Sequence, residues 1–292
     1  MNEINSLGVL VTGASSGIGA ATATLLASQG HRVVGAARRT GPIEKLPGVT
    51  AVGLDLTDSG SITSAVDAAT GKLGKVDVLI NNAGYGQFGS IEETPIDQAR
   101  RQLEVNVVGL IALTQQLIGP MREAGRGRIV NVSSLAGEFS SPMAGWYHAS
   151  KFALEALSDS MRLELGQFGI DVVVVQPGPV RTPWHDDALS SLDEASSEGP
   201  YAGTAQAVAR YHRAAKDLPV TSSIETAAEA IVRAATIRRP RPRYRVGRGA
   251  GTAVALSRLP DRAFDAMTKQ QFGITRTRKS VNASNVPTSE EL

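Results

Sequence analysis

Short apolar runs alternate with longer amphipathic segments between residues 8 and 177, and this alternation restricts the fold more than any other feature of the chain. The apolar runs, such as GVLVTG, VDVLIN and VVVVQP, are rich in Val, Ile and Leu and do not alternate with polar residues. Continuous apolar runs of this kind are typical of strands that helices cover on both faces. We therefore predict an α/β fold with a doubly wound parallel sheet of about seven strands.

Glycines mark the predicted helix ends, because glycine readily adopts the left-handed conformation that closes a helix. Gly30 closes the first predicted helix and Gly169 the one that begins near Tyr147. Gly125 and Gly127 close a long predicted helix in the middle of the chain.

The alternation weakens towards the C-terminus. Residues 183–223 have weak periodicity and many small and acidic residues, which predicts an irregular segment. A predicted helix at 224–237 and a short strand, RYRVG, follow it. Residues 238–279 form a basic C-terminal extension, and the polar residues 280–292 are expected to be disordered. We predict one Rossmann-type domain over residues 1–279.

The composition excludes several classes of protein. Hydrophobic residues make up 42% of the 292 residues and charged residues 20%, as in a soluble globular protein. The chain has no cysteine, which excludes disulfides, iron–sulfur clusters and cysteine nucleophiles, and we predict no metal site. The N-terminus lacks a signal-peptide pattern, and no apolar run reaches the roughly 18 residues of a spanning helix. We expect a cytoplasmic protein without a membrane span.

Charge is distributed unevenly along the chain. The formal net charge is +2, but residues 238–279 are rich in Arg and Lys and contain only Asp261 and Asp265 as acids. A basic segment can bind nucleic acid or a membrane surface. Its cations are interleaved with Pro, Gly and apolar residues, and no recognition motif accompanies them. We interpret the segment as a solvated edge or a subunit contact, and expect no nucleic-acid partner.

A glycine-rich turn, VLVTGASSGIGAATA, joins the first predicted strand to the first predicted helix. Gly13 permits the tight turn, Gly17 allows the backbone to approach a phosphate, and Gly19 lets helix and strand pack closely. The helix N-terminus offers free N–H groups to an anion. The spacing G-x-x-x-G-x-G in this context predicts a dinucleotide site, although such a turn can also be purely structural.

The end of the second predicted strand indicates which dinucleotide binds. In this fold an acid at that position bonds the ribose hydroxyl of NAD, whereas an arginine suits the 2′-phosphate of NADP. The stretch HRVVGAARR places Ala36 and Ala37 where the acid is expected, followed by Arg38 and Arg39. We predict NADP(H) as the cofactor; the alternative is that both arginines are ordinary surface charges.

Two further stretches follow predicted strands, at the sheet edge where ligands bind in this fold. In GLDLTD, Asp55 and Leu56 are placed to meet an adenine ring. Capping of the next helix by Thr57 or Asp58, with Asp55 in a simple turn, is equally compatible. In NNAG, residues 81–84, side-chain amides and a small-residue turn end the fourth strand.

The stretch WYHASKFALEAL places Tyr147 four residues before Lys151 in a predicted amphipathic helix. At 3.6 residues per turn the two side chains lie on one face, so their polar tips can share one site. Taken alone, such a pair is more often a core tyrosine and a solvated lysine. The other motifs of the chain decide between these two interpretations.

Six motifs occur together: TGASSGIG at 12–19, NNAG at 81–84, EVNVVG with Asn106, IVNVSS with Ser134, YHASK with Tyr147 and Lys151, and PGPVRT at 177–182. In this order and spacing, residues 8–182 resemble the classical short-chain dehydrogenase/reductase (SDR) family. YGQFGSIEETP and GWYHASKFALEALSDSMRLEL are similar to bacterial oxidoreductases near the retinol and 17β-hydroxysteroid dehydrogenase branch. The resemblance implies an NADP(H)-dependent enzyme that interconverts a ketone or aldehyde and an alcohol.

The resemblance also implies catalytic roles for four residues. Tyr147 would be the general acid/base, Lys151 its electrostatic partner and a ribose ligand, Ser134 the group that polarises the substrate oxygen, and Asn106 the holder of a proton-relay water. Physical chemistry agrees, because a tyrosine with a pKa of about 10 needs a nearby cation to act near neutral pH. Ser133 competes with Ser134, which stands thirteen residues before Tyr147, the usual interval in the family. Asn106 could instead be a buried amide that bonds the main chain.

The motifs also predict the residues that bind the cofactor. Thr182 is placed to meet a carboxamide or phosphate, although it could simply cap a helix. The irregular segment 183–223 resembles the family's substrate lid, which would exclude water from the reaction. The predicted cofactor-binding residues are Gly13, Ser15, Ser16, Gly17, Ile18, Gly19, Arg38, Asp55, Leu56, Asn82, Ala83, Gly84, Tyr147, Lys151, Pro177, Gly178, Val180 and Thr182.

The sequence leaves the substrate open. A moderately large, apolar carbonyl or alcohol is indicated by six residues that could equally be core: Phe139, Met143, Trp146, Trp184, Tyr201 and Tyr211. We expect a homodimer or homotetramer. The alternative function is a catalytically silent, NADP(H)-binding redox sensor, which the intact catalytic motifs oppose. A sugar-nucleotide epimerase or dehydratase would usually show G-x-x-G-x-x-G in the loop and a larger C-terminal domain.

Overall fold

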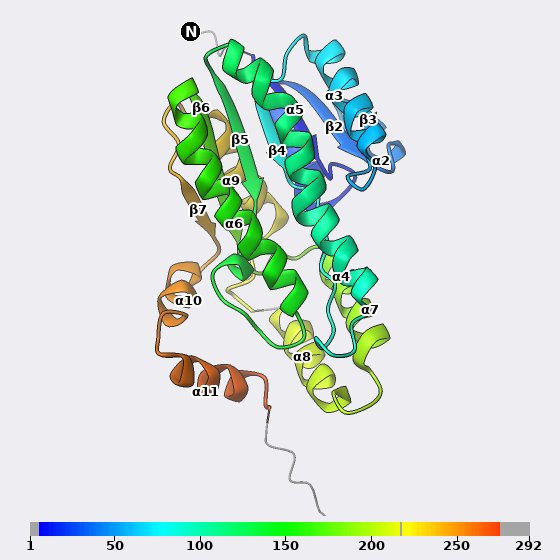
Figure 1. Ribbon diagram of the computed structural model, residues 1–292, viewed down its shortest axis with the longest axis vertical. Helices are drawn as coiled ribbons and strands as arrows, with labels where there is room; N and C mark the ends of the chain where they lie inside the picture. The colour runs from blue at the N-terminus through cyan, green and yellow to red at the C-terminus, as the bar shows by residue number, and fades with distance from the viewer. Residues whose placement is uncertain (1–5, 217, 275–292) are drawn as a thin grey trace, which may run out of the picture.

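A seven-stranded parallel sheet forms the centre of the protein in the computed structural model, which describes residues 6–216 and 218–274 (Figure 1). The strand order is β3-β2-β1-β4-β5-β6-β7, and every neighbouring pair is parallel. This confirms the predicted α/β, Rossmann-type architecture. The strands are β1 (Gly8–Thr12), β2 (Arg32–Ala37), β3 (Val49–Gly53), β4 (Val78–Asn81), β5 (Gly127–Val132), β6 (Ile170–Pro177) and β7 (Arg243–Val246).

Helices cover both faces of the sheet, as the continuous apolar runs predict. Leu10 of β1 belongs to the core under one helix layer, while Val9 and Val11 belong to the core under the other. Successive strand side chains point to opposite faces, so a strand covered on both sides must be apolar throughout. One layer contains α3 (Ser59–Leu73), α5 (Gly109–Glu123) and α6 (Gly145–Leu165), and the other α1 (Gly17–Ser28), α2 (Gly41–Glu44) and α9 (Ile224–Thr236).

The long helix predicted in the middle of the chain is interrupted. It consists of α4 (Ile96–Leu103), a π-helical turn η1 (Glu104–Val108) and α5. Asn106 lies in the π-helical turn, a kind of irregularity that is frequent at functional sites. Gly109 follows it at a close approach, because an added Cβ would lie 1.9 Å from the carbonyl oxygen of Leu56.

Most predicted chain reversals are found where expected. Gly30, Gly125 and Gly169 follow their helices with φ angles of 84°, 62° and 72°. Gly127, by contrast, begins β5 and closes no helix. The short helices η2 (Leu135–Gly137) and η3 (Gly166–Phe168) follow β5 and α6.

The segment predicted to be irregular is mostly helical, which corrects the sequence interpretation of residues 183–223. It forms α7 (Trp184–Ser196) and α8 (Ala202–Ala215). Their buried faces combine Leu189, Leu192 and Val208 with small residues, mostly alanine, so the apolar periodicity is weak in the sequence although the helices pack well. Together with α10 (Ala250–Leu256) and α11 (Asp261–Gln271), they lie beyond the carboxyl ends of the strands (Figure 1).

An arginine ties the last predicted helix to the sheet. Arg128 of β5 donates to the carbonyl oxygens of Ala234, Ala235 and Ile237 at the end of α9, at 3.1, 2.9 and 2.7 Å. These carbonyls have no partner within the helix, so the guanidinium satisfies groups that would otherwise need water. Helix 224–237 and the RYRVG strand are thus confirmed as α9 and β7.

Two further predictions concern the C-terminal tail and membrane-spanning helices. The tail at residues 280–292 lies outside the described residues. Over residues 6–216 and 218–274, none of the helices combines the length and apolar character needed to cross a bilayer.

Candidate active site

A cavity of about 920 Å³ lies at the carboxyl ends of the strands. Its lining runs from the glycine-rich turn after β1, past the ends of β2 to β6, to the helices α7, α8, α10 and α11. Every predicted catalytic residue lines it except Asn106, and so does every predicted cofactor-binding residue. The carboxyl edge of an open parallel sheet is the usual place for a ligand.

The glycine-rich turn has the geometry that the sequence predicts. Gly13 and Gly17 have φ angles of 67° and 53°, which favour glycine. A Cβ added to Gly19 would lie 2.3 Å from the carbonyl oxygen of Gly13, so only glycine fits there. Ser16 precedes α1 without a side-chain capping bond, and α1 has no acid in its first turn. The first-turn N–H groups are therefore suited to an anion such as a dinucleotide phosphate.

Thr12 and Asn82 fix this turn against β4. The Thr12 hydroxyl accepts hydrogen bonds from the backbone N–H groups of Asn82 and Ala83, both at 3.0 Å, and donates to the carbonyl of Ile80. The Asn82 amide donates to the carbonyl oxygens of Thr12 and Gly13 at 3.0 and 3.4 Å. Asn82 lines the cavity, as predicted, but its side chain holds the turn in place.

The far end of the cavity is cationic. β2 ends at Ala37, and the exposed Arg38 and Arg39 follow it on the cavity wall. Arg101, from α4, lines the same end and was not found from the sequence. Its only signal there was a basic pair, Arg100 and Arg101, in a helix without a recognised motif.

Asp55 lies in the simple turn given in the sequence analysis as the alternative to an adenine contact. Its Oδ1 accepts hydrogen bonds from the backbone N–H and the hydroxyl of Thr57 at 2.9 and 2.8 Å. These bonds hold the pKa of Asp55 below its usual value, because they favour the ionised carboxylate. Asp58 caps α3 by accepting from the N–H groups of Gly60 and Ser61. Asp55 and the buried Leu56 nevertheless line the cavity.

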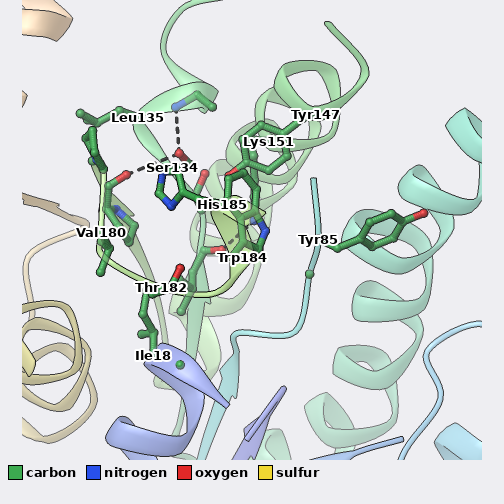
Figure 2. A pocket seen from close by; sticks show the side chains of 18 of the residues that line it. Ile18, Tyr85, Ser134, Leu135, Tyr147, Lys151, Val180, Thr182, Trp184 and His185 are labelled. Carbon is green, nitrogen blue, oxygen red and sulfur yellow. Dashed lines mark hydrogen bonds between the residues drawn. The ribbon is translucent and has the colours of Figure 1, made fainter. Parts of the chain in front are cut away.

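Ser134, Tyr147 and Lys151 meet at the centre of the cavity (Figure 2). Ser134 follows β5, and its Oγ accepts from the N–H of Ala136 at 3.1 Å. Tyr147 lies in the first turn of α6, close enough to Ser134 for the serine hydroxyl to influence its pKa. Lys151 is one turn further along, with its Nζ 5.9 Å from the centre of the tyrosine ring. The competing Ser133 is buried, and its hydroxyl finds no partner among the described residues.

From the sequence we expect Lys151 to lower the pKa of Tyr147. The structure indicates a different protonation of the pair. Burial raises the pKa of Tyr147 to about 12, against the opposing effect of the nearby Ser134 side chain. Burial also lowers the pKa of Lys151 to about 8, with Glu155 acting in the opposite direction. The Lys151 ammonium donates to the carbonyl of Val132 at 3.0 Å. The chain alone therefore keeps Tyr147 as a neutral phenol near pH 7.

Asn106 is a fully buried amide next to the cavity. Its Nδ2 donates to the carbonyl of Tyr85 at 2.9 Å and to Ser150 Oγ at 3.1 Å, and its Oδ1 accepts from the Tyr85 N–H at 3.1 Å. Asn106 thus matches the alternative given in the sequence analysis, a buried amide that bonds the main chain. The side chain fixes the segment after β4, which contains Gly84, to the π-helical turn.

Aromatic side chains complete the wall around Tyr147. The Trp184 and Phe88 rings lie 5.0 and 6.1 Å from the tyrosine ring, between centroids. His212 of α8, not singled out from the sequence, lies 5.4 Å from Phe88, and burial lowers its pKa to about 4. Of the six residues suggested for substrate contact, Phe139, Trp184 and Tyr211 line the cavity, whereas Met143, Trp146 and Tyr201 do not.

Thr182 faces the glycine-rich turn. The N-cap of α7 is Pro183, so the threonine does not cap that helix. Its Cγ2 lies 3.9 Å from the position of a Cβ added to Gly17, and Figure 2 shows it beside Ile18. A single cavity thus joins the glycine-rich turn to the serine, tyrosine and lysine.

Residues 8–192 match the family model described as short chain dehydrogenase. The chain therefore belongs to the short-chain dehydrogenase family. The SDR cavity described above contains the family motifs in one continuous site. The family placement and the geometry agree on an oxidoreductase that acts between carbonyls and alcohols with a nicotinamide dinucleotide.

Two curated relatives are similar over different lengths. The 3-ketodihydrosphingosine reductase of Bacteroides thetaiotaomicron is 40% identical over 179 residues, which cover 61% of this chain and 66% of the relative. The NADPH-dependent 3-dehydrocapnine reductase of Ornithobacterium rhinotracheale is 35% identical over 276 residues, covering 88% and 94%. The first match thus spans just under two thirds of that relative, whereas the second extends over most of both chains.

Solved structures extend the similarity to the whole fold of this SDR. A short-chain dehydrogenase from Streptomyces avermitilis has a TM-score of 0.76 at 32% identity, covering 95% of this chain and 100% of its own. A 3-ketoacyl-(acyl-carrier-protein) reductase from Brucella melitensis, complexed with NADH, has a TM-score of 0.70 at 26% identity, covering 84% and 98%. One relative is thus named as NADPH-dependent, and one solved structure contains NADH.

Proposed function

We propose that the protein is an NADP(H)-dependent reductase of ketones or aldehydes, with Tyr147 as the general acid. The observation that carries this proposal is the single cavity that Arg38, the glycine-rich turn, Ser134, Tyr147 and Lys151 line together. The reductase names of the two curated relatives, one of them NADPH-dependent, support the same direction.

The cavity residues fit a dinucleotide along its whole length. The first-turn N–H groups of α1 would hold the pyrophosphate, and Arg38 would bond the 2′-phosphate beside Ala37, which offers no carboxylate to a ribose. Lys151 would bond the nicotinamide ribose, and Thr182 the carboxamide. When bound, the cofactor supplies the hydride.

The protein residues stabilise the oxygen that receives charge. Ser134 donates a hydrogen bond to the substrate carbonyl oxygen, and Tyr147 transfers its proton to that oxygen as the alkoxide develops. A phenol with a pKa near 12 is protonated at neutral pH, so it enters the reaction as a proton donor. Lys151 then stabilises the phenolate that remains. Asn106 supports this arrangement by holding the segment after β4.

The remaining sequence predictions refine this proposal. α7 and α8 act as the substrate lid, because Trp184 and His212 close the cavity next to Tyr147.

Self-association through α6 is supported by Phe152 and Leu163, which are 43% and 78% exposed. The alternative of a silent redox sensor gains no support from a site that retains Ser134, Tyr147 and Lys151 together. Placement near the retinol and 17β-hydroxysteroid branch stays a prediction.

Titration of NADPH and NADH into the unmodified protein, followed by turnover with a ketone panel, tests the proposal. Charge-assisted bonds to a phosphate are worth roughly 1.5–3 kcal/mol, so NADPH should bind about tenfold to hundredfold more tightly. The double variant Ala37→Asp/Arg38→Leu removes the phosphate partner and supplies a diol partner. Its preference should shrink or invert. Equal affinity of the wild type for both cofactors would contradict the role of Arg38.

A further inference from the structure

One face of α11 is directed into the cavity. The residues of α11 and its C-cap that line the cavity are Phe264, Met267, Thr268, Gln271 and Phe272, spaced i, i+3, i+4, i+7 and i+8. This is the spacing of one face of an amphipathic helix, which normally faces a protein core, and Phe264, Met267 and Phe272 are its apolar members. None of the residues from Asp261 to Gln271 is buried. Among the residues that the structure describes, the stretch between Phe264 and Phe272 therefore lacks the close-packed core that such a face usually has.

α11 is held at its two ends. Near its start, the Phe264 ring lies 6.1 Å from Phe139, which follows β5. At its end, the Phe272 ring lies 4.7 Å from Tyr211 of α8, and Gln271 donates to the Tyr211 hydroxyl at 2.6 Å. Eight residues separate the two phenylalanines, so the helix extends about 12 Å between these anchors.

The cavity walls from the segment after β5 and from α10 contribute several apolar side chains. Leu135 and Phe139 line it after β5, and Ala250, Ala253 and Leu256 line it from α10, beside the polar Ser140, Ser141 and Thr252. The charged residues of α11, Asp261, Arg262, Asp265 and Lys269, are exposed and do not line the cavity. The cavity thus has an apolar arm continuous with the site at Ser134 and Tyr147.

We propose that this arm binds an unbranched alkyl tail of the substrate, with Phe264 and Met267 of α11 as its specificity-determining contacts. The inference rests on the proposed carbonyl reduction and deepens it, because it names the substrate class: a ketone with a long linear alkyl chain. The tail takes the place of the missing protein core along this face of α11. Its contribution is hydrophobic, so affinity rises with the number of buried methylenes.

The test is a series of straight-chain 2-alkanones of increasing length, assayed with NADPH as kcat/KM. Each buried methylene contributes a roughly three- to fourfold gain, so the series should climb steeply until the arm is filled. Calorimetric titration of the same ketones into the protein saturated with NADP+ should show the same trend in Kd. A flat series in both measurements would overturn the proposal.

Variants on the two faces of α11 locate the effect. Phe264→Ala removes a large apolar contact and should weaken the longest ketones about tenfold to hundredfold, leaving the shortest within twofold. Met267→Ala should give a smaller loss with the same length dependence. Lys269→Ala, on the charged face, is the matched control and should leave the whole series unchanged. Equal behaviour of Phe264→Ala and Lys269→Ala would refute the assignment.

The two measurements separate this inference from the proposed function. If no ketone is reduced but calorimetric affinity still rises with chain length and depends on Phe264, the tail site stands and the reductase proposal fails. If short ketones are reduced in a Tyr147-dependent manner but neither kcat/KM nor Kd depends on length, the reductase proposal stands and the tail site fails. Circular dichroism and thermal unfolding of each variant check that α11 and the fold persist.

Discussion

The nucleotide region, residues 8–182, and the outer region, made of α7, α8, α10 and α11, are built on different principles. In the nucleotide region, polar side chains are buried and bonded to the main chain, as Thr12, Asn82 and Asn106 show. In the outer region, α11 has no buried residue and contacts its neighbours near its ends. Fixed geometry therefore surrounds the proposed catalytic residues, whereas α11 presents an unburied face to the proposed substrate tail.

The largest expected effect concerns the centre of the nucleotide region. Tyr147→Phe removes the proton donor but leaves the ring packing, so turnover should fall by about 10²–10⁴-fold. NADPH affinity should persist, because the glycine-rich turn and Arg38 are untouched. Steady-state kinetics together with cofactor titration measure both quantities. Near-normal turnover of this variant would show that another group supplies the proton.

The second effect tests how rigid the nucleotide region is. Gly19→Ala places a Cβ against the carbonyl oxygen of Gly13. Because both groups are backbone-fixed, we expect a loss of about 3 kcal/mol in the free energy of unfolding and much weaker cofactor binding. Gly71→Ala in α3 is the control, since nothing lies within 4 Å of its added Cβ. Chemical denaturation should show Gly71→Ala to be neutral or stabilising; similar losses in both would contradict the close approach.

The third effect belongs to the outer region and depends on pH. Burial lowers the pKa of His212 to about 4, below its ordinary value of 6.5. Between these values the unfolded chain binds more protons than the folded one, so the free energy of unfolding falls as the pH falls from 6.5 to 4. His212→Gln should remove roughly 2 kcal/mol of that fall. Denaturation curves at pH 7 and pH 4.5 give the comparison, and an unchanged slope would place His212 in water.

The smallest expected effect concerns local opening of the backbone, which should cost less free energy in α11 than in the strands of the nucleotide region. Amides of α11 should exchange with solvent far faster than those of β1 and β4, because α11 has no buried residue and the strands are buried throughout. Hydrogen exchange of the unmodified protein measures this directly. A long-chain ketone bound with NADP+ should slow the exchange of α11. Equal protection of α11 and β1 without ligand would remove the contrast between the regions.

The sequence allowed the fold and much of the site to be predicted, because both depend on patterns within short stretches. Strands covered on both faces must be apolar throughout, and a phosphate-binding turn must contain glycines at fixed positions. Interactions between residues far apart in the sequence produce weaker patterns in the sequence itself. The many small residues on the buried faces of α7 and α8 produced little periodicity, and the position of Arg101 on the same cavity as Arg38 depends on how α4 packs. The protonation of Tyr147 could not be deduced either, because the burial of its side chain and the opposing effect of Ser134 decide it.

The hydrogen bonds of Thr12 have a consequence for synthesis on the ribosome. The hydroxyl bonds residues 68 to 71 positions further along the chain. At roughly 5–20 residues per second, the phosphate-binding turn emerges several seconds before the partners that give it its shape. Until β4 pairs with β1, the turn lacks the hydrogen bonds that hold its shape. We therefore expect a dinucleotide to bind the growing chain only after that pairing, so that it would stabilise later stages of folding without starting them.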